Sequence, residues 1–194
     1  MEKQQLWLLA GGNGAGKSTF YRIYLEPQGM PFVNADLLAR QLFPDEPEAR
    51  SYEAAIIAGE IRAQFLQEGR TFCFETVFSH PSKIDFIAQS KVMGYEIVLV
   101  FIHLENVALN HARIAQRISE GGHHVPAEKV INRIPRTLTY VQQALPLCDY
   151  VYILDNSRAD NPFQQIAVLH HNQLKIIKNP LALWSKVILA DYLT

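Results

Sequence analysis

Residues 11–18 read GGNGAGKS, a full match to the phosphate-binding pattern G-x-x-x-x-G-K-[ST]. The apolar run 5–10 precedes this stretch and a helical segment follows it, which is the context that the motif requires. Glycines let the backbone N–H groups converge on phosphate oxygens, and the helix presents its positive N-terminal end to them. The alternative, a glycine-rich turn that only links a strand to a helix, does not explain why Lys17 and Ser18 follow the last glycine. The stretch therefore predicts an ATP-binding P-loop.

The residue types of the loop predict its ligands as well. Lys17 is expected to reach the terminal phosphates, and the Ser18 hydroxyl is placed to ligate Mg²⁺. ATP and Mg²⁺ are therefore the expected cofactors. We expect the nucleotide to contact Gly12, Asn13, Gly14, Ala15, Gly16, Lys17, Ser18 and Thr19.

The remaining sequence narrows the class of P-loop protein. No NKxD guanine-reading motif is present, which argues against a GTPase. A motor ATPase would need an acid at the end of an apolar strand, and the run 97–103 ends in His103-Leu104-Glu105, a poor match. Single polar residues instead follow several predicted strands, at the sheet edge where open α/β folds bind ligands. This pattern favours a small-molecule kinase.

Composition excludes several other classes of protein. The chain has 194 residues and a net charge of −1, so we expect no basic surface for nucleic acid. No apolar run approaches the roughly 20 residues of a membrane helix, and no secretory signal opens the chain, so a cytoplasmic protein without a membrane partner is expected. Cys73 and Cys148 lie in apolar runs, which favours buried free thiols over a disulfide.

Outward from the loop, strand-like and helical runs alternate. Apolar strands are expected at 5–10, 31–34, 71–78, 95–103 and 150–154. A first helix is expected from the loop to just before Pro27. Helical segments then follow Asp36 as far as residue 67, with a break at Pro44 and Pro47. Further helices are expected over 81–93, over 106–119 and from Pro126 onward. The pattern predicts a three-layer α/β P-loop kinase-like fold with a mostly parallel sheet. We expect one domain over 1–194, with a helical lid at about 106–145 and a hairpin and closing helix at about 163–194.

Two acids lie at the ends of predicted strands. Asp36 follows the second strand and is interpreted as the base that accepts a proton from an acceptor hydroxyl; the alternative is a helix N-cap. Glu75 lies within the apolar run TFCFETVF, where an unpaired carboxylate is costly and needs a partner or a ligand. With Thr76, it is expected to bind acceptor hydroxyls or to help at the metal; the alternative is a structural contact to backbone N–H groups or an arginine.

Four arginines flank a pair of glycines. Arg113 and Arg117 are four residues apart and share one helix face, and Arg133 and Arg136 are three apart on the next helix. Gly121 and Gly122 lie between these helices, so the segment can fold as a lid that brings cations to the transferred phosphoryl group. The alternative is a solvated helix face. His123 and His124 are interpreted as loop residues, because no third metal ligand is suitably spaced.

Together these residues resemble the zeta toxin kinases. The resemblance rests on GGNGAGKST, NADLLA around Asp36, FETVFSH around Glu75, and RIAQRISEGGHHVP leading to NRIPR, with a weaker match at residues 154–157. It covers residues 5–157 in the order of the family. The resemblance implies a P-loop kinase fold, phosphorylation of the 3′-hydroxyl of the amino sugar in UDP-N-acetylglucosamine, and an antitoxin partner in many systems.

The resemblance also implies roles for single residues. Lys17 and Ser18 would hold ATP and Mg²⁺, Asp36 would be the general base, and Glu75 would contact the acceptor sugar. Arg117 and Arg133 best match the arginines that hold the transferring phosphate, with Arg113 and Arg136 as alternatives; Asp155 and Asn156 would lie near the nucleotide base. Two other hypotheses remain: a housekeeping kinase for a nucleoside, nucleotide or other metabolite, and a nucleotide-binding switch without small-molecule transfer.

Overall fold

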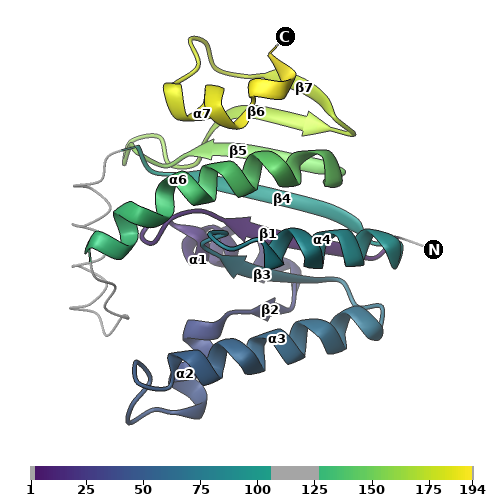
Figure 1. Cartoon of the computed structure of the whole chain (residues 1–194), viewed down its shortest axis with the longest axis vertical. Helices are drawn as coiled ribbons and strands as arrows, with labels where there is room; N and C mark the ends of the chain where they lie inside the picture. Colours follow the sequence, from purple (N-terminus) through teal and green to yellow (C-terminus); the bar gives the residue numbers. More distant parts are fainter. Residues whose placement is uncertain (1–2, 106–126, 194) are drawn as a thin grey trace.

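The computed structural model of the chain describes residues 3–105 and 127–193. Its centre is a seven-stranded sheet with the order β2-β3-β1-β4-β5-β6-β7 (Figure 1). The strands from β2 to β5 are parallel, whereas β6 and β7 pair antiparallel at one edge. The strands are β1 Gln5–Ala10, β2 Phe32–Val33, β3 Phe72–Thr76, β4 Glu96–His103, β5 Tyr150–Asp155, β6 Gln164–His170 and β7 Gln173–Ile176.

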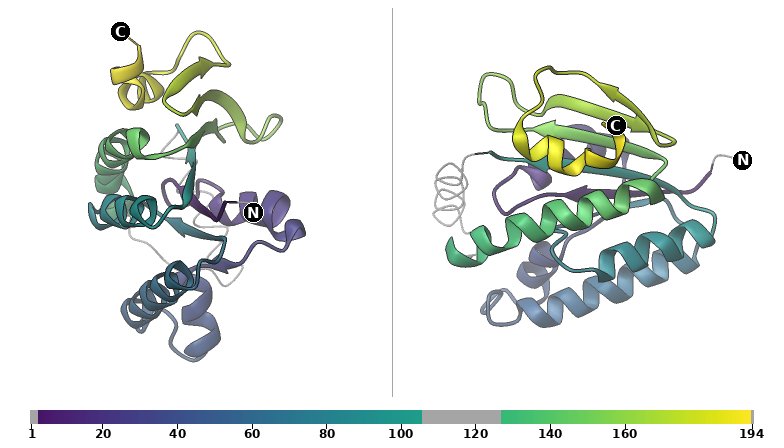
Figure 2. Two further views of the ribbon diagram at one scale, coloured as in Figure 1. Left: turned by 90° about the vertical axis from the view of Figure 1, so that its right-hand side faces the viewer. Right: turned by 45° about the horizontal axis from the view of Figure 1, so that its top comes forward.

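Helices cover both faces of this sheet. The α-helices are α1 Lys17–Phe20, α2 Ala35–Leu42, α3 Ser51–Gln67, α4 Ser82–Val92, α6 Ala127–Ala144 and α7 Leu183–Ile188. A π-helical turn, Tyr21–Leu25, continues α1, and short 3-10 turns lie at Glu26–Gln28, Leu145–Leu147 and Ala190–Tyr192. Helices α3, α4, α6 and α7 lie on one face, and α1 lies on the other (Figure 2). The result is three layers.

The central strands are apolar throughout because helices bury both of their faces. In β1, Leu6 and Leu8 point into the larger core under α3, α4 and α6, whereas Leu9 points into the smaller core beside α1. The carboxyl ends of β1, β3 and β4 meet at one edge, so the P-loop, Glu75 and His103 lie at that edge.

Most element predictions are confirmed, and the exceptions have local causes. The helix predicted to end before Pro27 is instead one short α-helix followed by π and 3-10 turns, with Pro27 early in the last turn, where its missing N–H is tolerated. The strand predicted over 71–78 ends at Thr76, because Phe78 has a positive φ of 61° and its N–H donates to Thr76 Oγ1. The closing helix is split into α7 and a 3-10 turn. The helix predicted over 106–119 lies outside the described residues.

The predicted C-terminal hairpin is confirmed as β6 and β7. Its turn residues, His171 and Asn172, have φ values of 45° and 63°, the left-handed pair that a two-residue hairpin turn needs. Cys73 and Cys148 are buried free thiols, as predicted. In the described part of the chain, no helix is long and apolar enough to cross a membrane. The extent of the single domain and of the lid stays a prediction.

Candidate active site

The P-loop runs from the end of β1 into α1, and its glycines are needed for steric reasons. Gly11 has a φ of +150°, and a Cβ there would lie 2.2 Å from the carbonyl oxygen of Ile102 on β4. Gly16 has a φ of +101°, and a Cβ there would lie 2.5 Å from Asn156 Nδ2. The loop is therefore held closely between β4 and the segment after β5.

Lys17 is the first residue of α1 and is 8% exposed. Its ammonium group lies back over the loop, where Nζ donates to the carbonyl oxygens of Gly11 at 2.9 Å and Gly12 at 3.0 Å. The structure thus places this cation against the loop backbone, at the site where the motif predicts phosphate oxygens.

Glu75 lies beside the P-loop because β3 is the parallel neighbour of β1, with Leu9 opposite Glu75. The Ser18 hydroxyl donates to Glu75 Oε2 at 2.7 Å. The partner that this carboxylate was predicted to need is therefore a hydroxyl of the P-loop, rather than an arginine or a backbone N–H. Thr76 Oγ1 accepts the hydrogen bond from Phe78 N–H at 3.0 Å, which shapes the turn after β3.

Asp36 lies in the first turn of α2, but it does not cap the helix. Asn34 is the N-cap, and its Oδ1 accepts hydrogen bonds from the N–H groups of Asp36 at 2.8 Å and Leu37 at 3.1 Å. The alternative interpretation of Asp36 as an N-cap is therefore wrong. Asp36 instead lines an open cleft together with P-loop residues.

This cleft has a volume of about 800 Å³, which is enough for a nucleotide and a small acceptor. Lys17 and Ser18 line it at the P-loop, and Asp36 and Arg40 line it from α2. Other walls are aromatic or apolar and include Tyr24, Pro162 and Phe163. A polar phosphate end, a carboxylate and apolar walls thus share one cavity.

Asn156 directly follows β5 and holds the P-loop by a hydrogen bond to its backbone. Its Nδ2 donates to Ala15 O at 2.8 Å, and its Oδ1 accepts from Phe163 N–H at 3.3 Å; the residue is 6% exposed. The Phe163 ring packs edge-on against Phe20 and Tyr24, with ring centroids 5.5 and 6.0 Å apart. Asp155 is occupied locally, because its Oδ1 accepts from Ser157 N–H. Sequence reasoning missed the link from Asn156 to the loop.

The arginines are only partly described. Arg113 and Arg117, like His123 and His124, lie outside the described residues. On α6, Arg133 is half-buried and Arg136 is exposed, with its Nε donating to Asn132 O at 3.3 Å. Neither of these two lines the cleft. Contacts of Arg117 and Arg133 with phosphate therefore stay predictions.

The packed side of α6 carries other residues. Thr137 Oγ1 donates to Val77 O at 2.9 Å. Ile134 and Thr137 also line a small cavity with Gly12 and His103. The helix is therefore fixed both to the turn after β3 and beside the P-loop.

β4 ends at this edge in His103, which is mostly buried. Burial lowers the pKa of His103 to about 4, although the neighbouring Asp155 carboxylate opposes that shift. The imidazole is thus neutral near pH 7, and it stacks on Trp184 of α7 with ring centroids 4.3 Å apart. His103 joins the C-terminal helix to the sheet edge.

Comparisons with solved structures give the fold. The AvrRxo1-ORF1:AvrRxo1-ORF2 complex matches with a TM-score of 0.75 and 15% identity over 96% of this chain, which spans 64% of that longer chain. A structure from the PezAT chromosomal toxin–antitoxin system of Streptococcus pneumoniae matches with a TM-score of 0.62 and 16% identity, over 85% of this chain and 72% of that one. A putative kinase of Chloroflexus aurantiacus matches with a TM-score of 0.61 and 16% identity, over 82% of this chain and 92% of that one.

Comparisons of sequence give the family. An uncharacterised protein of Haemophilus influenzae is 28% identical over 138 residues, which are 68% of this chain and 97% of that protein. The family model described as an AAA domain, AAA_33, matches residues 6–139 and so includes the P-loop, Asp36 and Glu75. The chain therefore belongs to the AAA domain family AAA_33, and it has the P-loop kinase fold.

Proposed function

We propose that the protein is an ATP-dependent kinase of the zeta toxin type, which transfers the γ-phosphate of ATP to a hydroxyl of a nucleotide sugar such as UDP-N-acetylglucosamine. The family and the fold support the broader class, an ATP-dependent P-loop phosphotransferase. One observation carries the proposal: Asp36, which the helix does not need as a cap, shares a cleft with Lys17 and Ser18.

In the proposed reaction, the ATP phosphates lie along Gly12–Thr19. Lys17 leaves the carbonyls of Gly11 and Gly12 and binds phosphate oxygens, because a negatively charged oxygen forms a stronger hydrogen bond with an ammonium group than a neutral carbonyl does. Asp36 accepts the proton of the acceptor hydroxyl while that oxygen bonds to the γ-phosphorus. The bond from the γ-phosphorus to the bridging oxygen breaks, and ADP leaves with the electron pair. Arg117 and Arg133, or their neighbours Arg113 and Arg136, would stabilise the charge on the transferred group.

The residues beside the P-loop suit Mg²⁺ as the cofactor. Ser18 Oγ and the Glu75 carboxylate are joined at 2.7 Å, and both supply the hard oxygen atoms that Mg²⁺ prefers. When bound with ATP, Mg²⁺ would neutralise negative charge on the phosphate oxygens. Ser18 would hold it directly. We propose that Glu75 and Thr76, on the same strand end, bind the acceptor; the hydrogen bond from Ser18 also supports a place for Glu75 at the metal.

Mass spectrometry tests the reaction directly. The purified protein is incubated with ATP, Mg²⁺ and UDP-N-acetylglucosamine, alongside Lys17→Ala and Asp36→Asn. We expect a sugar nucleotide heavier by one phosphoryl group with the wild type. Lys17→Ala should slow its formation by at least about 100-fold, and Asp36→Asn should retain ATP binding without transfer. Turnover by Lys17→Ala at the wild-type rate would refute the mechanism. Phosphoryl transfer by Asp36→Asn at the wild-type rate would show that Asp36 is not the general base.

The toxin assignment and an antitoxin partner need a test in cells. Support comes from the similarity to a structure of the PezAT toxin–antitoxin system. Induced expression of the wild type should arrest bacterial growth, whereas Lys17→Ala should not. Growth at the normal rate, with kinase activity intact, would favour a housekeeping kinase. Tight ATP binding without transfer to any small acceptor would favour a nucleotide switch.

A further inference from the structure

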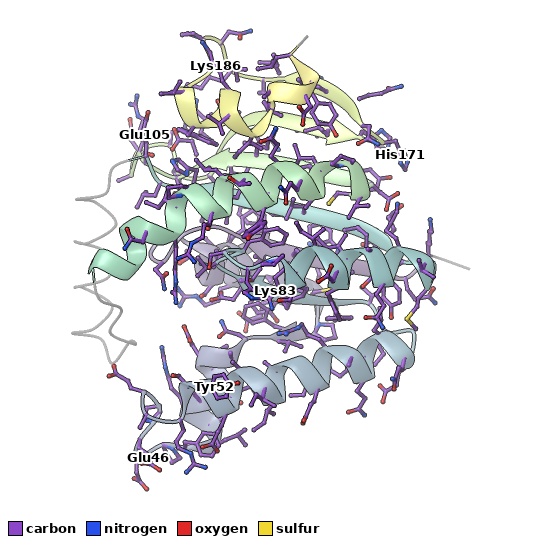
Figure 3. The ribbon with its side chains drawn as sticks, viewed as in Figure 1. Glu46, Tyr52, Lys83, Glu105, His171 and Lys186 are labelled. Carbon is purple, nitrogen blue, oxygen red and sulfur yellow. The ribbon has the colours of Figure 1, made fainter. Side chains whose placement is uncertain are left out.

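Two basic side chains belong to neighbouring helices, α3 and α4, on the sheet face opposite α1. The guanidinium carbon of Arg62, on α3, lies 5.0 Å from the ring centroid of Phe74 and 5.9 Å from that of Phe86. Lys83 is in the first turn of α4, and Figure 3 labels it at the start of that helix. Both side chains are half-buried. Burial is the main cause of the lowered pKa of Lys83, and the positive charge of Arg62 nearby adds to it.

Within residues 3–105 and 127–193, neither of these cations makes a hydrogen bond or an ion pair with a protein group. Arg50, Arg70, Lys91 and Arg158 each pair with a carboxylate. Burial lowers the pKa of Arg62 and of Lys83, and no acid among the residues that the structure describes opposes these shifts. Two like charges at a partly buried place oppose folding unless something else compensates them.

The arrangement suits a compact oxyanion. A guanidinium offers five N–H donors and an ammonium offers three, and no protein group in the described part of the chain accepts a hydrogen bond from any of them. The guanidinium carbon lies over the rings of Phe74 and Phe86, and a guanidinium that stacks on a ring can still form bidentate hydrogen bonds through its edge. The Nη2 atom of Arg62 lies 3.7 Å from where a Cβ of Gly59 would be, so a small residue leaves room beside the guanidinium.

We propose that Arg62 and Lys83 form a second anion site, distinct from the P-loop, which binds a carboxylate or phosphoryl group of a small molecule. Phe74 directly precedes Glu75 on β3, so the site lies close to the strand end that enters the active site, but on the other face of the sheet. The anion is either a charged group of the acceptor itself, which rests on the proposed function, or a separate ligand.

Binding of inorganic phosphate tests the site, with calorimetry as the measurement. Lys17→Ala serves as the background, because the P-loop would otherwise bind phosphate as well. Adding Arg62→Gln or Lys83→Gln should weaken phosphate binding at least tenfold, and Arg62→Lys should restore part of it. The matched control is Arg70→Gln: Arg70 also lies over an aromatic ring, Phe65 at 4.0 Å, but it pairs with Glu68.

Equal phosphate affinity in the background and in the Lys83→Gln variant would overturn the proposal. So would equal losses with Arg62→Gln and with the Arg70→Gln control. Lys83 is the second residue of α4 and is only half-buried, so its substitution should leave the fold intact. The test therefore stays valid even if Arg62→Gln fails to fold. Circular dichroism checks that each variant is folded.

Steady-state kinetics in the chain with Lys17 intact then identifies the source of the anion. If it belongs to the acceptor, Arg62→Gln should raise the KM of the acceptor about tenfold and leave the KM of ATP unchanged. If phosphate binding is lost but the KM of the acceptor is unchanged, the site takes a separate ligand. Because phosphate binding is measured without turnover, a failure of the kinase proposal would leave that result standing.

Discussion

At the scale of the residue, Gly11 and Gly12 are adjacent but face different surroundings. A Cβ on Gly11 would lie 2.2 Å from Ile102 O, whereas nothing lies within 4 Å of one on Gly12. Gly11→Ala should therefore cost about 2 kcal/mol or more of the free energy of unfolding, because the loop must move off β4. Gly12→Ala should change it by less than about 0.5 kcal/mol. Urea unfolding of both variants checks this, and equal midpoints would contradict it.

Asn156 acts on the nucleotide site through the loop backbone. Asn156→Ala removes the hydrogen bonds to Ala15 O and from Phe163 N–H, and so frees the loop from the segment before β6. We expect the KM of ATP to rise about tenfold, with a smaller change in kcat. This rise corresponds to roughly 1.4 kcal/mol for the bond to Ala15 O, which is the one of the two that reaches the P-loop. Asn161→Ala, an exposed asparagine of the same segment, is the control. A change in kcat alone would show that Asn156 does not position the loop.

How far the site could be predicted depends on the separation of its residues in the chain. The P-loop roles of Lys17 and Ser18 are local, so their positions follow from one short motif. The partner of Glu75 is 57 positions away and depends on the pairing of β3 with β1. The partner of Asn156 is 141 positions away and depends on the loop after β5. Periodicity carries no information about such pairings.

At the scale of the element, α7 is joined to the sheet by the stack of His103 on Trp184. The pKa of His103 is about 4 in the folded protein and 6.5 as a free side chain, so its protonation favours unfolding. Its contribution to stability is complete above pH 6.5 and is lost as the pH falls toward 4. The slope reaches at most about 1.4 kcal/mol per pH unit.

His103→Phe should flatten this part of the stability profile, because it keeps an aromatic ring on Trp184 but removes the titration. The measurement is urea unfolding at several pH values between 4 and 7, compared with the wild type. His170→Phe, at an exposed position at the end of β6 where the ring stacks on Tyr150, is the control for exchanging a histidine ring for a phenylalanine ring. Parallel profiles for the wild type and His103→Phe would show that other groups cause the acid sensitivity.

The elements themselves were predictable wherever burial governs them. Five parallel strands read as continuous apolar runs because helices cover both of their faces. The π-helical turn at Tyr21–Leu25 could not be predicted, because it depends on packing: Tyr21 stacks on Phe32, and its hydroxyl donates to Met30 O. The sequence does not single out Asn34 as the cap, because Asp36, two residues later, is an equally good cap by residue type.

At the scale of the whole molecule, the core extends beyond the segment that the family model matches. That model ends at residue 139, yet Ile166, Leu169, Trp184 and Ile188 belong to the main core cluster. A chain ending at residue 162 would expose this core and unpair β5 from β6. We expect it to lose cooperative thermal unfolding, as followed by circular dichroism. A sharp transition within a few degrees of that of the full chain would show that the hairpin and α7 are dispensable.

The order of the strands also bears on how the molecule behaves at high concentration. Among the described strands, the two shortest lie at the edges of the sheet: β2 has two residues and β7 has four. Short edges expose few unpaired backbone groups, and the exposed Lys175 on β7 adds a charge that an incoming strand would have to desolvate. The long, apolar strands that would aggregate most readily are thus enclosed, and the sheet offers little on which another chain could extend it.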